Sequence, residues 1–137
     1  MPKNYNIITK TVRAKGTTGS GVAIGSSVAT GMKRYVTFVH INQAAGAGNK
    51  GSKIWFCSTA ATATASSTTL ANTAMKLMVL INSAANAGVH KSVMLPDYPD
   101  PENPLFSIAA GKFLTVRSSK LQLGSNSCAI FVQYYDQ

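Results

Sequence analysis

The sequence predicts an all-β protein, an antiparallel β-sandwich or jelly roll of about seven or eight short strands. β-Branched and aromatic residues gather in short runs, of which RYVTFVHINQ (34–43) and SKIWFCST (52–59) are the strongest. Long stretches rich in Gly, Ser, Thr and Ala separate these runs. Only 12% of the residues are charged, against ~25% in typical soluble domains. Surface helices rich in Glu and Lys are therefore not expected.

The first half of the chain supplies three strand candidates and one short apolar piece. Residues 4–14 alternate loosely, with Ile8 and Val12 on one face, and predict a basic arm or an edge strand. The apolar piece GVAIG follows within a Gly-rich stretch. The run 34–43 alternates, with Val36 and Phe38 on one face and with Tyr35, Val39 and Ile41 on the other. In the run 52–59, Trp55 is the expected core anchor.

The segment 70–87 is open to two interpretations. With Thr69 as N-cap and Gly88 just after its end, it could form a helix. Alternatively, residues 75–82 form a strand buried on both faces. We favour the strand, because the neighbouring elements are β and because Asn and Ser follow at once.

The last third contains further strand candidates around a proline-rich loop. Residues 89–95 predict a strand, and the four prolines of 96–104 predict an extended irregular loop. Two short strands are expected on either side of a turn at Gly111, followed by a terminal strand, CAIFVQYYDQ. No internal repeat is found. The expected organisation is a basic N-terminal arm, 1–15, and one β-sandwich domain, 16–137.

The charge of the chain is strongly asymmetric. The formal net charge is +9, and no acidic residue precedes Asp97. Three of the four acids, Asp97, Asp100 and Glu102, lie in the proline-rich loop. This pattern indicates an anionic partner or charge-complementary contacts between copies. The alternative is that the positive charge only keeps the surface soluble.

Targeting and redox signals are few. The N-terminal residues contain no apolar signal-peptide core, and no run approaches the ~20 apolar residues of a membrane span. We therefore expect synthesis in a cytoplasm and no membrane partner. Cys57 and Cys128 lack CxxC spacing, which favours two buried thiols over a disulfide.

The stretch GAGNKG (46–51) matches the G-x-G-x-x-G pattern of dinucleotide-binding turns. That motif needs a helix after the glycines and an acidic residue about 20 residues later. Here a β-branched and aromatic run follows, and no acid occurs before Asp97. We interpret the stretch as a long hairpin connection between 34–43 and 52–59, and we expect no cofactor.

Catalytic and metal-binding patterns are weak throughout, so the chain is expected not to be an enzyme. Asp97, Asp100 and Glu102 could form a weak Ca²⁺ site, but a solvated acidic loop is the simpler reading. His40 and His90 are expected to be structural or surface residues, and Cys57 has no activating context. No catalytic residue, cofactor or metal is predicted.

Nucleic acid is a possible partner. Lys3, Lys10, Arg13 and Lys15 lie in the arm, and four further basic residues, Lys33, Arg34, Lys50 and Lys53, flank the two central strands. Phosphate binding independent of sequence needs only such charge. The aromatic residues interleaved with Lys and Arg on an exposed sheet, typical of RNA-binding sheets, are missing.

The final stretch LFSIAAGKFLTVRSSKLQLGSNSCAIFVQYYDQ resembles the ending of small jelly-roll virion proteins of tailed bacteriophages, of the capsid decoration or cement type. This resemblance implies a virion structural protein that assembles, commonly as a homotrimer, and clamps capsid subunits. A glycan-binding or adhesin-like β-sandwich, with Tyr98 as its aromatic contact, is one alternative. A basic coat protein that packages nucleic acid is another.

On this reading the N-terminal arm is the partner-binding segment, and strand addition supplies its affinity. Tyr134 and Tyr135 near the C-terminus are candidates for an exposed apolar surface used in oligomerisation; the alternative is that either ring belongs to the core. The complete set of expected partner-binding residues is Lys3, Tyr5, Ile7, Ile8, Lys10, Arg13, Lys15, Tyr134 and Tyr135.

Overall fold

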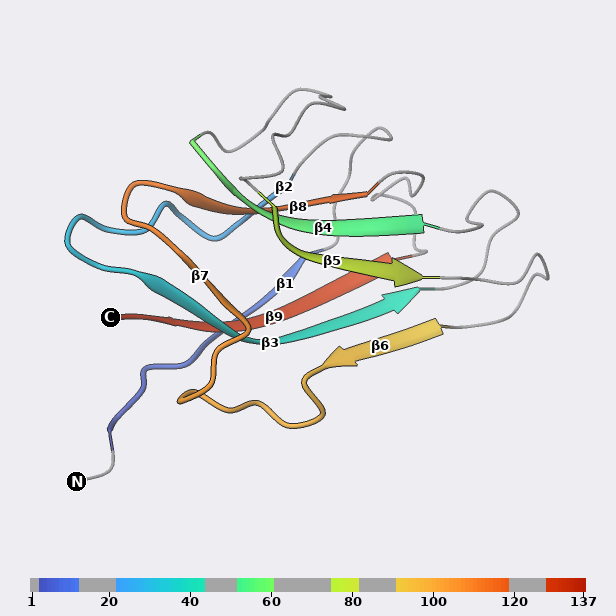
Figure 1. Ribbon diagram of the computed structural model, residues 1–137, viewed down its shortest axis with the longest axis horizontal. Helices are drawn as coiled ribbons and strands as arrows, with labels where there is room; N and C mark the ends of the chain where they lie inside the picture. Colours follow the sequence, from blue (N-terminus) through green and yellow to red (C-terminus); the bar gives the residue numbers. More distant parts are fainter. Residues whose placement is uncertain (1–2, 13–21, 44–51, 61–74, 82–90, 119–127) are drawn as a thin grey trace.

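The computed structural model describes residues 3–12, 22–43, 52–60, 75–81, 91–118 and 128–137. In these ranges the protein is all-β, with nine strands in two antiparallel sheets (Figure 1). The predicted antiparallel β-sandwich is therefore confirmed. The described residues include no helix of the length and apolarity that a membrane span requires.

Each sheet is built from strands distant in sequence. The first sheet has the order β1 (Ile8–Val12), β9 (Cys128–Asp136), β3 (Arg34–Gln43) and β6 (Lys91–Leu95), and β7 (Phe106–Ile108) also pairs with β3. The second sheet has the order β2 (Val22–Ile24), β8 (Phe113–Ser118), β4 (Ser52–Thr59) and β5 (Met75–Ile81). The predicted N-terminal arm thus contributes an edge strand, β1, to the sandwich.

The core lies between the two sheets. Alternate side chains of each strand point inward, as the two-residue period of a strand requires. Fully buried residues come from β3, β4, β8 and β9: Val36, Ile41, Ile54, Phe56, Leu114, Val116, Ile130 and Val132. Phe56 also meets Phe106 of β7, with ring centroids 6.2 Å apart. Trp55 is only half-buried, because Ile54 and Phe56 take the inward positions, so the predicted core anchor is wrong.

The ambiguous segment after residue 74 forms a strand, β5, which confirms the favoured interpretation. It is not buried on both faces, however. Val79 is buried and Leu77 packs against the core, whereas Lys76 and Met78 are exposed. The reason is that each strand of a two-layered sandwich turns only one face toward the core, so alternate side chains of β5 face away from it.

The predicted hairpin between 34–43 and 52–59 is wrong. β3 and β4 lie in different sheets, so residues 44–51, which are outside the described ranges, do not close a hairpin. The two short strands expected on either side of Gly111 are present as β7 and β8, which pair in different sheets. Strand propensity is local, but the choice of pairing partner depends on distant segments.

A β-bulge in β3 changes which side chains face the core. Val36 pairs with Tyr134, but Phe38 pairs with Gln133, so Thr37 has no opposite residue. Beyond the bulge Val39 and Ile41 point inward like Val36, and Phe38 points outward. The prediction that Val36 and Phe38 share a face is therefore wrong.

Candidate functional site

Three tyrosines gather on the outer face of the first sheet. Tyr35 of β3 and Tyr135 of β9 are register partners, and their rings stack with centroids 5.1 Å apart and an interplanar angle of 22°. Tyr5, from the segment before β1, packs on Tyr135 at 4.7 Å with a tilt of 54°. We call Tyr5, Tyr35 and Tyr135 the tyrosine cluster.

The proline-rich loop, residues 96–105, is fastened over one side of this cluster. The hydroxyl of Tyr135 donates a hydrogen bond to the carbonyl oxygen of Pro101 at 2.9 Å. Farther along, the amide of Leu105 donates to the carbonyl of Val36 at 2.8 Å. Asp100 accepts from the Glu102 amide and from the Asn103 side chain, at 2.9 and 2.7 Å. The loop is thus ordered by its own contacts and by the sheet.

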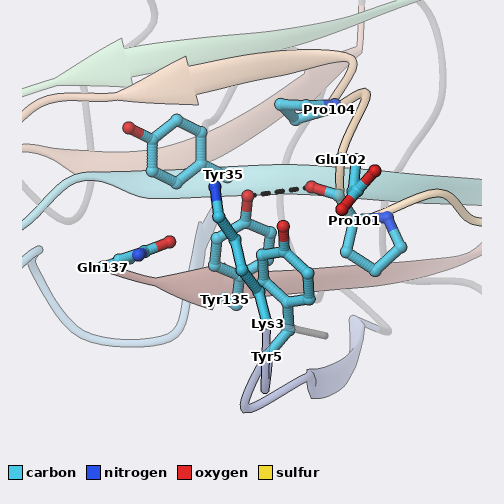
Figure 2. Close-up of a pocket in the computed structure, with 8 residues that line it drawn as sticks. All are labelled: Lys3, Tyr5, Tyr35, Pro101, Glu102, Pro104, Tyr135 and Gln137. Carbon is cyan, nitrogen blue, oxygen red and sulfur yellow. Dashed lines mark hydrogen bonds between the residues drawn. The ribbon is translucent and has the colours of Figure 1, made fainter. Parts of the chain in front are cut away.

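A pocket of about 490 Å³ opens between the tyrosine cluster and this loop (Figure 2). Its lining residues come from the N-terminal segment, β3, the loop and the end of β9: Lys3, Tyr5, Tyr35, Pro101, Glu102, Pro104, Tyr135 and Gln137. Tyrosine and proline rings form the apolar part. Lys3 and Glu102 add charges of opposite sign, and neither forms an ion pair with a described residue.

The electrostatics keep Tyr135 neutral. Burial raises the pKa of its phenol above the ordinary value of 10.0, and the nearby Tyr5, Tyr35 and Glu102 raise it further. Only 6% of Tyr135 is exposed. At neutral pH the phenol therefore remains a hydrogen-bond donor to the loop.

A second polar cluster is centred on Arg34, at the start of β3. The guanidinium forms a two-point ion pair with Asp136 and lies over the ring of Tyr134, 4.1 Å from its centroid. Its third nitrogen donates to the carbonyl of Ser26 at 2.8 Å. Arg34 is 2% exposed. Arg34 is therefore not available to contact a phosphate, since its donors are used within the chain.

The predicted partner-binding residues of the arm have different environments. Lys3 and Tyr5 line the pocket, Ile7 and Lys10 are exposed, and Ile8 packs against the core. The remaining two, Arg13 and Lys15, lie outside the described residues.

The two C-terminal tyrosines are buried. Tyr134 belongs to the core and is 2% exposed. Tyr135 lines the pocket beneath Tyr5 and the loop. These two rings therefore do not form an exposed apolar surface, and the core alternative holds for Tyr134: inward alternation buries Tyr134, and the loop and Tyr5 cover Tyr135.

Several residues that sequence analysis singled out lie away from the pocket. Tyr98 is 84% exposed and is not among the lining residues. His40 shares a hydrogen bond of 2.7 Å with the hydroxyl of Ser92. Cys57 is fully buried, whereas the side chain of Cys128 lies outside the description. Within the described ranges, no group of three His, Cys, Asp or Glu side chains is arranged to hold a metal ion.

Sequence analysis missed Tyr35, Pro101, Pro104 and Gln137 as members of one site. The sequence signal for this site is that Tyr35 and Tyr135 each lie next to an inward-facing residue of a strong strand, which places both rings on an outer face. The sheet order needed to place them side by side was not available from the sequence.

Comparisons with protein-family models, with curated proteins and with solved structures each give no match to this chain.

Proposed function

We propose that this protein is a non-enzymatic virion structural protein that self-associates and decorates or stabilises a capsid. The observation that supports the proposal is the strand order. With β7 set aside, the orders β1-β9-β3-β6 and β2-β8-β4-β5 match those expected when two Greek keys fold into an eight-stranded jelly roll. Viral capsid domains are among the proteins that use this fold.

Exposed apolar side chains on edge strands support self-association. Met78 of β5 and Met94 of β6 are 44% and 52% exposed, and each strand is the outermost of its sheet. An edge strand offers unpaired backbone donors and acceptors to another chain. The edges at β5 and β6 are therefore two surfaces on which a second copy of the chain can pair.

The N-terminal segment supports a contact with a neighbour. Among the described strands, β1 pairs with β9 alone, through the five register pairs from Ile8 with Tyr134 to Val12 with Ile130. The same main-chain pairing can be made by β1 of a second copy, which is the geometry of strand exchange. Lys3 and Lys10 then carry positive charge toward an acidic capsid surface.

The test combines solution mass with particle binding. Light scattering on the purified protein is expected to show a closed oligomer, a trimer of 14.4 kDa chains. Co-sedimentation with capsid shells of the virus that encodes this chain is expected to show saturable binding. A monomer at all concentrations together with no co-sedimentation would reject the proposal.

A deletion variant tests the contribution of the segment before β1, which carries Lys3. Removing residues 1–7 leaves β1 and Ile8 in place, so the fold is expected to persist by circular dichroism while particle binding weakens. Lys112→Gln, an exposed charge in the turn before β8 and outside the proposed contact strands, is the matched control and is expected to bind normally. If the protein instead binds plain polyanions with a steep salt dependence, a nucleic-acid-packaging coat is the better assignment.

A further inference from the structure

We propose that the tyrosine pocket is a binding site for a neutral saccharide of one or two pyranose rings. This site is separate from the capsid role and does not depend on it. The pocket volume of about 490 Å³ falls within the ~300–1,000 Å³ of small-molecule sites. The choice of ligand class follows from the rings, the polar groups and the charges that line the pocket.

The rings supply an apolar surface for a sugar. A pyranose has one face of C–H groups that packs on an aromatic ring, with its hydroxyls pointing outward. Tyr5 and Tyr35 are only partly buried, so each ring retains surface toward the pocket (Figure 2). Neither phenol hydroxyl forms a hydrogen bond with a described residue, which leaves both to pair with a ligand.

The polar lining matches hydroxyl groups, which both donate and accept. The Lys3 ammonium offers donors, the Glu102 carboxylate offers acceptors, and the Gln137 amide offers both. These groups surround the apolar rings, so a ligand with an apolar face and a polar edge satisfies all of them together.

The charges argue against an ionic ligand. An aromatic cage for a quaternary ammonium needs rings that surround a gap. Here Tyr35 and Tyr135 stack directly on each other, and Lys3 repels a cation. Glu102 in turn repels an anion. A lining with one positive and one negative side chain favours a ligand without net charge.

A proline-rich peptide is disfavoured because the chain already uses that mode of contact internally. Aromatic grooves bind such peptides through ring packing and hydrogen bonds to carbonyl groups. Pro101 and Pro104 already form one wall of the pocket, and the Tyr135 hydroxyl already donates to the Pro101 carbonyl. The Tyr135 hydroxyl that a proline-rich peptide would need is therefore already used within the chain.

The pocket is also ordered before a ligand arrives. Bonds from Tyr135 to Pro101 and from Leu105 to Val36 hold the loop at both sides. A site built in advance loses less conformational entropy on binding, which matters for saccharides because their contacts are individually weak.

The test is a titration of the full chain with glucose, galactose, mannose, N-acetylglucosamine, lactose, maltose and chitobiose. Saturation-transfer NMR is expected to detect at least one of them, with transfer concentrated on the C–H protons of one ring face. Tyr35→Ala is expected to weaken that sugar at least tenfold. Tyr35→Phe keeps the ring and loses only the hydroxyl, so its loss is expected to be a few-fold.

Two exposed variants keep the test independent of folding. Lys3→Gln and Glu102→Gln are each expected to weaken the sugar a few-fold, with unchanged circular dichroism. Tyr98→Ala, an exposed tyrosine outside the pocket, is the control and is expected to bind normally. The proposal is overturned if no sugar of the panel binds, or if binding is indifferent to Tyr35→Ala. It is also overturned if choline, phosphate or a polyproline peptide binds the pocket more tightly than every sugar.

Discussion

Arg34 and Asp136 form a two-point ion pair across 102 positions of the chain, with Nε and Nη2 of the arginine each 2.8 Å from a carboxylate oxygen. The same guanidinium donates to the carbonyl of Ser26, in the segment after β2, and lies over Tyr134. Arg34 therefore connects the start of β3, the end of β9 and the segment after β2, and these three elements come from both sheets.

Removing the carboxylate leaves a buried cation without its partner. Asp136→Ala is expected to lower the free energy of unfolding by about 3–5 kcal/mol, the usual cost of breaking a buried pair. Urea denaturation measures it. Asp97→Ala, in the exposed loop, is the control and is expected to change stability by less than about 0.5 kcal/mol. The double variant Arg34→Met with Asp136→Leu is expected to lose less than Asp136→Ala alone; an equal or larger loss would contradict this account.

Gly25 is expected to tolerate a side chain less well than Gly31. Its φ of +74° is left-handed, and an added Cβ would lie 2.6 Å from the Tyr134 hydroxyl. Gly31 has a similar φ of +80° but open space around it. Gly31→Ala is therefore expected to cost only the backbone strain, about 1–2 kcal/mol, and Gly25→Ala roughly 1–3 kcal/mol more. Thermal or urea unfolding of both variants measures the difference, and equal losses would show that Tyr134 moves aside freely.

Stability is expected to fall at high pH because of the buried phenols. The pKa of Tyr135 is raised above 10.0 by burial, so its neutral form stabilises the fold fully below pH 10. As the pH rises past 10.0, the Tyr135 phenol ionises in the unfolded chain before it ionises in the folded chain. The stabilisation is then lost as the pH rises through the pKa of Tyr135 in the folded chain. Burial also raises the pKa of Tyr134, against an opposing effect of Arg34.

The urea midpoint measured from pH 8 to pH 11 checks this prediction. Tyr135→Phe is expected to lose about 1 kcal/mol at neutral pH through the missing hydrogen bond and to show a shallower decline above pH 10. If the urea midpoint of Tyr135→Phe falls as steeply above pH 10 as that of the unaltered chain, groups other than Tyr135 cause the decline. Tyr98→Phe, at the exposed tyrosine, serves as the control.

The proline-rich loop is expected to loosen at low pH. The Asn103 side chain and the Glu102 amide, in that order, hold the pKa of Asp100 below its ordinary 3.8. The loop contacts are therefore present above pH 3.8 and lost as the pH falls through the folded pKa. The amide chemical shift of Glu102 is expected to report this titration, and Asn103→Ala is expected to move it toward 3.8. A midpoint above 3.8 in the unaltered chain would contradict the contact.

Local sequence was sufficient to locate most strands. The runs 34–43 and 52–59 match β3 and β4 residue for residue, and the segment after residue 74 forms β5. β-Branched and aromatic content and two-residue alternation act over neighbouring residues, so a single sequence carries this information. The bulge at Thr37 was missed, because it is defined only against the partner strand.

The candidate site was only partly visible in the sequence. Lys3, Tyr5 and Tyr135 were expected to meet a partner, but not one another. Tyr35 and the loop prolines join them because β3 pairs with β9 and because residues 96–105 fold back over that pair. These contacts connect positions near opposite ends of the chain, and no local pattern encodes them.

The amino-acid sequence alone predicts the all-β class and the positions of the strong strands. It also shows a basic chain in which three of the four acidic residues lie in one proline-rich loop. The tertiary contacts set which strands pair. They also bind the Arg34 guanidinium to Asp136, bury Tyr134 in the core and place Tyr135 in the lining of a pocket. Propensity and charge are properties of neighbouring residues, whereas pairing and burial depend on segments that meet only in the folded chain.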